Sequence, residues 1–175
     1  MSIEDTLKNI IAMEGGFVDD PDDNGGATKY GITQKTLTSW RAKECSKDDV
    51  ATLSKAEARE IYYAWYYIKP GFQALPKTVQ PIMVDMAVNH GASKAVKMLQ
   101  DVLTCYGYDI GKIDGKLGKK THAGVLLAES EMGNQLINGL VNRRILFYQS
   151  LVQENPSQLK FLTGWTNRAE SYRVA

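Results

Sequence analysis

The sequence holds few of the side chains on which nucleophilic, redox and metal sites usually depend. It has two cysteines, Cys45 and Cys105, and two histidines, His90 and His122, and no two of them form a short-spaced pair such as CxxC. We therefore expect two reduced, partly buried thiols rather than a disulfide framework or a zinc site. The two isolated histidines leave little material for a Ser/His/Asp triad or a histidine-rich metal centre.

The sequence also lacks an excess of either charge and a long apolar run. Lys and Arg total 21 and Asp and Glu total 20, which argues against a general nucleic-acid-binding protein. The longest apolar run near the N-terminus, residues 10–13, is too short for a signal peptide, and no stretch approaches the length of a membrane-spanning helix. We therefore expect a globular protein that is made in the cytoplasm, has no export signal of its own and does not insert into membranes.

Apolar periodicity and capping residues predict a chain that is mainly α. The first helix is expected to begin after Ser2, whose spacing to Asp5 is that of a capping box, and to end at Gly15-Gly16. Thr33 is expected to cap a second helix over residues 34–40, and Ser54, with capping-box spacing to Glu57, a third over residues 55–65. Further helices are expected over residues 78–89, 93–106, 119–131, 133–154 and 163–172. One short β element is expected around residues 27–32.

A glutamate stands at the end of the first apolar stripe. Ile3, Leu7, Ile10 and Ile11 form this stripe, and continuing it by one helical step leads to Glu14. Burial and the negative end of the helix dipole would both favour the neutral carboxyl group. We therefore expect Glu14 to be a proton-donating acid in a desolvated position.

The loop after this glutamate, residues 18–32, is rich in Asp, Gly and Asn. Its stretch DPDDNG (20–25) matches the first half of a calcium-binding EF-hand loop, but Gly31 stands where the bidentate glutamate is required. The surrounding acids would repel a phosphate, which argues against a phosphate-binding glycine loop. An acidic surface turn would account for the composition, although not for Glu14 or for the open backbone that the glycines offer to a ligand.

The remaining interpretation of this loop is hydrolysis of a glycosidic bond. Enzymes of this kind commonly use one protonated and one ionised carboxyl group in different environments. Glu14 suits the first role, and Asp23, in a polar loop next to glycines, suits the second.

Several stretches of the sequence resemble glycoside hydrolase family 108, the N-acetylmuramidases typical of phage endolysins. They are EGGFVDDPDDNGGATKYGIT (14–33), AREIYYAWYY (58–67), VDMAVNHG (84–91) and GWTNRAESY (164–172). From about residue 92, AVKMLQDVLTCYGYDIGKIDGKLGKKT (95–121) resembles the predicted peptidoglycan-binding region that usually follows. The resemblance covers nearly the whole chain, and the opening motif is its most specific part.

The resemblance implies a mainly α (α+β lysozyme-like) fold, in which a small β-hairpin or loop carries the active-site acids. It implies a catalytic region over residues 1–91 and a peptidoglycan-binding-like helical region over residues 92–175, or one lysozyme-like unit formed by both. The implied activity is that of a monomeric endolysin that hydrolyses the β-1,4 bond between N-acetylmuramic acid and N-acetylglucosamine in bacterial peptidoglycan. No metal ion or organic cofactor is implied, and release from the host cytoplasm is expected to depend on a holin.

The family motif, matched residue by residue, implies Glu14 as the catalytic acid. Eight residues separate it from Asp23, as in the better-known phage lysozymes, but Thr28 follows Asp23 after four residues, one fewer than in those enzymes. Asp22 would restore the second spacing and break the first. We therefore take Asp23 as the second carboxylate and Thr28 as the residue that positions water, and we expect Tyr30 to reach the same cleft through its hydroxyl group.

Other polar and aromatic residues have two interpretations each. Asn89 either bonds a sugar acetamido group or ends its helix, and Trp65 either stacks on a sugar or packs in the core. Asp85 lies between apolar neighbours, so we expect a buried structural hydrogen bond. Arg143 and Arg144 either face anionic wall polymer or lie on a solvated helix face, and we expect the solvated face.

Other functions remain open at this point. A lytic transglycosylase would cut the same bond with Glu14 alone and leave an anhydro product. A non-catalytic cell-wall-binding protein would bind without cleavage, with the acids as solvated turn residues. A calcium-dependent interaction module would be sensitive to a chelator.

Overall fold

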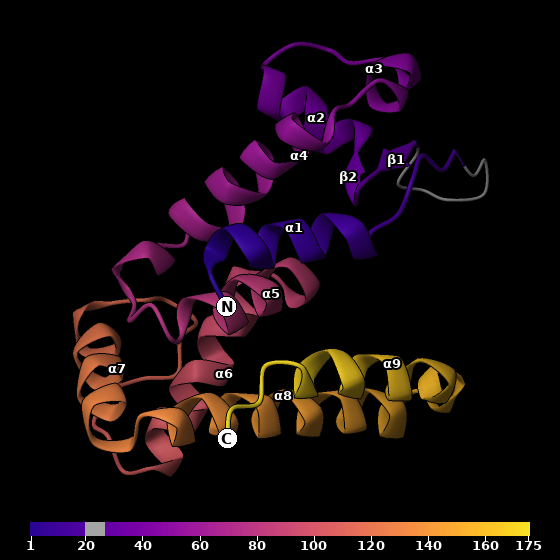
Figure 1. Ribbon diagram of the computed structural model, residues 1–175. Coiled ribbons are helices and arrows are strands. Elements are labelled where there is room, and N and C mark those ends of the chain that lie inside the picture. Colours follow the sequence, from indigo (N-terminus) through magenta and orange to yellow (C-terminus); the bar gives the residue numbers. More distant parts are fainter. Residues whose placement is uncertain (20–26) are drawn as a thin grey trace. The chain divides into compact units, whose positions relative to one another are not determined.

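The computed structural model describes residues 1–19 and 27–175 (Figure 1). Both candidates for the second carboxylate, Asp22 and Asp23, lie outside the described residues.

The described chain forms two compact units, residues 1–69 and 70–175. Helices make up most of the regular structure in both, and the sheet found among the described residues has two short strands. The predicted mainly α, lysozyme-like fold with a small β-hairpin is therefore confirmed. The division at residue 91 into catalytic and wall-binding regions stays a prediction, because compactness alone says nothing about which residues catalyse or bind.

In the first unit, the N-terminal ends of the α-helices are capped by the hydroxyl groups of serine and threonine side chains. In chain order this unit contains α1 (Ile3–Met13), β1 (Thr28–Lys29), β2 (Ile32–Thr33), α2 (Gln34–Arg41), α3 (Lys47–Ala51), α4 (Lys55–Tyr62) and a π-helix (Tyr63–Ile68). Ser2, Thr33, Ser46 and Ser54 each accept a hydrogen bond from the backbone N–H three residues ahead. The caps that the sequence predicts at Ser2, Thr33 and Ser54 are thereby confirmed.

A network of ion pairs ties α2 to α3 and α4. The Arg41 guanidinium donates to both carboxylate oxygens of Glu57, at 2.8 and 2.7 Å, and to Asp49 at 3.0 Å. Such two-pronged contacts fix direction as well as distance. Buried apolar side chains from α1, β2, α2, α3 and α4 include Leu7, Ile10, Ile32, Leu37, Val50 and Ile61. The unit therefore has a core that holds its short hairpin and helices.

The second unit is built from longer helices. It contains a 3-10 turn (Phe72–Ala74), α5 (Gln80–His90), α6 (Ala92–Cys105), α7 (Lys119–Met132), α8 (Asn134–Glu154), a second 3-10 turn (Pro156–Gln158) and α9 (Leu159–Glu170). Helices α8 and α9 lie side by side and run in opposite directions (Figure 1). Asn138 near the start of α8 exchanges two hydrogen bonds with the backbone of Val174, which fastens the last residues of the chain to α8.

A buried cluster of charges joins α5, α8 and α9. Asp85 is 2% exposed, and its Oδ2 lies 2.6 Å from Nη2 of Arg144, which is fully buried. Its Oδ1 accepts hydrogen bonds from Nε and Nη2 of Arg168, at 3.0 and 2.8 Å. The expected buried structural role of Asp85 is confirmed.

The expectation of a solvated Arg144 is wrong. Its neighbour Arg143 is partly exposed and pairs with Asp101 at 2.7 Å, but Arg144 points inward to the carboxylate of Asp85. A buried aspartate requires a buried partner, and that requirement outweighs the usual preference of arginine for the surface.

His90 ends α5 beside this cluster, with its ring edge against two aromatic rings of α8. Burial, and then the charge of Arg144, lower the pKa of His90 to about 4, and Arg168 adds to this shift while Asp85 opposes it. His90 therefore carries less of a proton in the folded protein than in the unfolded chain between about pH 4 and pH 6.5. Well above pH 6.5 the imidazole is neutral in both states, so it does not change the unfolding free energy. As the pH falls through this window, protonation favours the unfolded chain and the unfolding free energy decreases.

Replacing His90 with glutamine should make stability less dependent on pH in this window. The slope of the unfolding free energy against pH between pH 4 and 6.5 should become shallower by up to about 1.4 kcal/mol per pH unit, the value for one proton. Urea denaturation at a series of pH values measures the slope. Equal slopes in the wild type and the variant would contradict the prediction.

The helices expected from the sequence are all present, with small shifts at their ends. The main differences are α3, which was not predicted, and α9, which begins at Leu159, earlier than expected. Cys45 is buried and Cys105 is exposed, and both are free thiols. Among the helices of the described ranges, none combines the length and the apolar character needed to span a membrane.

Candidate active site

Glu14 caps the C-terminal end of α1. Its backbone N–H donates to the carbonyl of Ile10 at 3.0 Å, and its side chain is exposed. The expectation of a desolvated Glu14 is wrong. The buried stripe ends at Ile11, and α1 stops at Met13, so no further helical turn covers the carboxylate.

The hairpin that faces this glutamate has a tight two-residue turn. Strands β1 and β2 pair antiparallel, with Thr28 opposite Thr33, and Tyr30 and Gly31 connect them with φ values of 52° and 72°. Positive φ at both central residues is typical of a type I′ turn. Glycine adopts this conformation freely, whereas a tyrosine needs support from its surroundings.

The carboxylate of Glu14 rests against the glycine of this turn. A Cβ atom placed on Gly31 would lie 2.8 Å from Oε2 of Glu14 and 2.5 Å from the hydroxyl oxygen of Tyr62. Both oxygens therefore occupy space that any side chain at Gly31 would fill. The Tyr62 hydroxyl in turn donates to the carbonyl of Tyr30 at 2.8 Å.

A second tyrosine completes this group. Tyr66 lies one helical turn beyond Tyr62, and the two ring centroids are 5.4 Å apart. Burial, together with the negative charge of Glu14, raises the pKa of Tyr66. Its hydroxyl group therefore keeps its proton at neutral pH and stays a hydrogen-bond donor.

Thr28 and Trp65 lie on the elements around the group. Thr28 is half-buried in β1. Its backbone N–H donates to the carbonyl of Val18 and its carbonyl accepts from the N–H of Val18, both at 2.8 Å. This pair of bonds joins the chain before residue 20 to the chain after residue 26. Trp65 is also half-buried and contacts Trp40 edge to face, with centroids 6.3 Å apart. The roles expected for both remain predictions.

Asn89 belongs to the second unit. It lies in the last turn of α5, is exposed, and donates to the carbonyl of Asp85 at 2.7 Å. This contact supports its interpretation as a residue that ends a helix, while its role toward a sugar stays a prediction.

The structure therefore brings Glu14 and the backbone of Tyr30 together with Gly31, Tyr62 and Tyr66. The i, i+4 spacing of the two tyrosines was the signal that could have paired them. For Gly31, the signal was the tyrosine-glycine dipeptide between two short β-like stretches, which indicates a hairpin turn.

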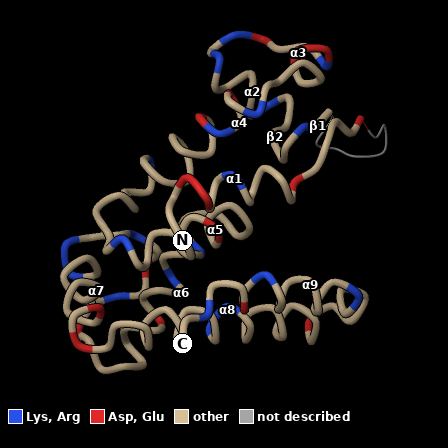
Figure 2. The backbone as a smooth tube through the Cα atoms, viewed as in Figure 1, with Lys and Arg blue, Asp and Glu red and all other residues tan. Residues whose placement is uncertain are grey.

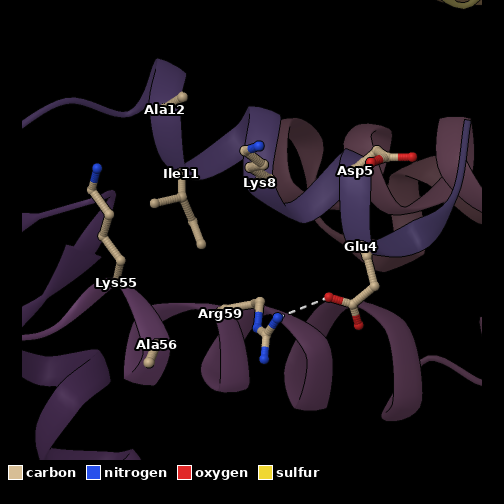
Figure 3. Close-up of a pocket in the computed structure, with 8 residues that line it drawn as sticks. All are labelled: Glu4, Asp5, Lys8, Ile11, Ala12, Lys55, Ala56 and Arg59. Carbon is tan, nitrogen blue, oxygen red and sulfur yellow. Dashed lines mark hydrogen bonds and ion pairs between the residues drawn. The ribbon is translucent and has the colours of Figure 1, made fainter.

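A groove lies between α1 and α4 (Figure 3). It has a volume of about 620 Å³, and the charged residues around it are Glu4, Asp5, Lys8, Lys55 and Arg59. Glu4 pairs with Arg59 at 2.9 Å across the groove. Of the residues that surround Glu14 in the described chain, neither Gly31 nor Tyr62 nor Tyr66 lines the groove, and Glu14 itself does not line it. The groove is therefore distinct from the Glu14 site.

The charges on the described chain favour neither a metal site nor a polyanion. Figure 2 shows basic and acidic residues interspersed along both units. Within the described ranges, no group of three or more His, Cys, Asp and Glu side chains could hold a metal ion. The acids of residues 20–23 lie outside those ranges.

Comparisons with known proteins identify the family of the chain. The family model Glycosyl hydrolase 108 matches residues 7–91, and the model Predicted Peptidoglycan domain matches residues 94–170. Among solved structures, that of Brucella abortus SagA is 34% identical with a TM-score of 0.73, over 97% of this chain and 90% of that one. No curated protein matches the chain. The chain therefore belongs to the glycosyl hydrolase 108 family, as a peptidoglycan-hydrolysing enzyme with a C-terminal peptidoglycan-binding region.

Proposed function

We propose that this protein is an N-acetylmuramidase, which hydrolyses the β-1,4 bond from N-acetylmuramic acid to N-acetylglucosamine. The observation that carries the proposal is the placement of Glu14. Its carboxyl group is exposed at a helix end, yet it rests against Gly31 and beside the hydroxyl group of Tyr62. An acid that is accessible and also held in place suits proton transfer to a polymer.

In the proposed reaction, Glu14 protonates the oxygen that links the two sugars. The bond from this oxygen to C1 of N-acetylmuramic acid breaks, and N-acetylglucosamine leaves with a 4-hydroxyl group. Asp23 either stabilises the positive charge that develops at the sugar or, with Thr28, orients the attacking water. The water oxygen bonds to C1, and its proton passes to a carboxylate.

The exposure of Glu14 is compatible with this role. A glycan strand is long, so the acid that cuts it within the chain must be open to solvent before the strand binds. Bound sugar would then cover Glu14 and exclude water, and desolvation favours the protonated form of a carboxyl group. Binding itself would thereby supply the environment that α1 does not provide.

We further propose that the protein acts as a monomeric endolysin. In this proposal it gains access to the wall through a pore made by another protein, and the wall-binding region keeps it on its substrate. The membership of its family and the match of residues 94–170 to a peptidoglycan domain support the wall as its site of action.

Product analysis tests the bond that is cut. Purified peptidoglycan is digested, the new sugar ends are reduced with borohydride, and the fragments are identified by mass spectrometry. Reduced N-acetylmuramic acid is the expected product. Reduced N-acetylglucosamine would indicate a glucosaminidase, 1,6-anhydro ends would indicate a lytic transglycosylase, and binding without release would indicate a wall-binding protein.

A further inference from the structure

We infer that Tyr62 is a positioning residue for Glu14, acting through the backbone of the Tyr30–Gly31 turn. The inference rests on the proposed role of Glu14 as the acid. It assigns a function to a tyrosine that touches the turn rather than the glycosidic bond.

The first step of the argument is the need for support at the turn. Tyr30 has a φ of 52°, a conformation that costs a non-glycine residue free energy. The carbonyl of Tyr30 belongs to the rigid peptide plane that continues to Gly31. A hydrogen bond to this carbonyl therefore fixes the plane and, with it, the position of the Gly31 backbone.

The second step is the identity of the donor. The hydroxyl group of Tyr62 donates to the Tyr30 carbonyl at 2.8 Å, across a sequence separation of 32 residues. Tyr62 is only 2% exposed, so its ring is held by the core and its hydroxyl group has little freedom to move. The turn is therefore fixed to α4, a helix of the same compact unit.

The third step is the contact between the turn and the acid. Gly31 lies so close to Glu14 that a Cβ atom on it would meet Oε2 at 2.8 Å and Cδ at 3.2 Å. The backbone of Gly31 thus forms the surface on which the carboxylate rests. Any movement of the turn changes where the carboxylate can lie, and catalysis is sensitive to displacements of about 1 Å.

Replacing Tyr62 with phenylalanine tests the inference, because it removes the hydroxyl group and keeps the ring. Turnover of soluble glycan-strand fragments by the full chain is measured at saturating substrate and well below the unfolding temperature. We expect kcat to fall on the order of 10- to 100-fold while KM changes less than about threefold. A purely structural role would lower the unfolding temperature and leave kcat of the folded fraction unchanged.

The matched control is Tyr63→Phe, the same chemical change on an adjacent, exposed tyrosine. This control should retain wild-type kcat. If Tyr62→Phe also keeps wild-type kcat, the inference is wrong and the proposed function stands. If the wild type itself releases no muramidase product, the proposed function fails first.

A second variant changes the turn residue that contacts the Glu14 carboxylate. Gly31→Ala places a Cβ atom where Oε2 of Glu14 lies and also strains the turn, so it should lower kcat at least as much as Tyr62→Phe. If both changes act through the turn, the double variant should lose less than the product of the two single losses. Independent, multiplying losses would overturn the inference.

Discussion

Glu14→Gln is expected to slow cleavage of peptidoglycan by roughly 10²- to 10⁴-fold, the usual contribution of a general acid. Glutamine has nearly the same shape as glutamate and can still occupy the space against Gly31, but it cannot give a proton to the leaving oxygen. The rate of appearance of new reducing ends measures the effect. The unfolding free energy should change by less than about 0.5 kcal/mol, because the side chain is exposed.

The control for this substitution is Glu60→Gln, the same change at an exposed glutamate of α4. It should leave the rate of cleavage unchanged. Retention of the wild-type rate in Glu14→Gln would remove Glu14 from the mechanism. Loss of wall binding together with loss of cleavage would point to a binding role for the carboxylate.

Asp85→Ala is expected to destabilise the protein by about 3–5 kcal/mol, the largest effect on stability that we predict. The substitution leaves Arg144, which is fully buried, without its counter-charge, and it also breaks the hydrogen bonds that Arg168 donates to the carboxylate. Helices α5, α8 and α9 meet at this carboxylate, so its loss affects the whole second unit. Urea denaturation at neutral pH measures the change.

Asp101→Ala provides the comparison. It breaks the pair with Arg143, in which both side chains are partly exposed, so the expected loss is about 0–1 kcal/mol. Similar losses in the two variants would mean that burial does not decide the strength of these pairs. A loss below about 1 kcal/mol for Asp85→Ala would show that water or other hydrogen-bond acceptors compensate for the buried arginine.

Local signals in the sequence were sufficient for much of the fold. Hydroxyl groups at Ser2, Thr33 and Ser54 predicted where helices begin, because the capping bond joins residues that are neighbours in the chain. The opening motif likewise indicated the family and the candidate acid, since a short segment carries both. Asp85 was recognised as buried because it interrupts an apolar stretch.

Long-range contacts were beyond such signals. Nothing near Arg144 in the sequence indicates that it meets Asp85 rather than solvent, and Arg168 joins the same carboxylate across 83 residues. The exposure of Glu14 was misjudged for the same reason, because burial depends on what covers a helix and not on its periodicity alone.

The sequence by itself determined the helical class, the caps at Ser2, Thr33 and Ser54, the family and the choice of Glu14 as the candidate acid, all of which depend on residues close together in the chain. Tertiary structure alone decided how that glutamate is held. The contact of its carboxylate with Gly31, and the hydrogen bond from Tyr62 to the turn, join three separate segments. Such contacts form only when the core places those segments together, so no local pattern can encode them.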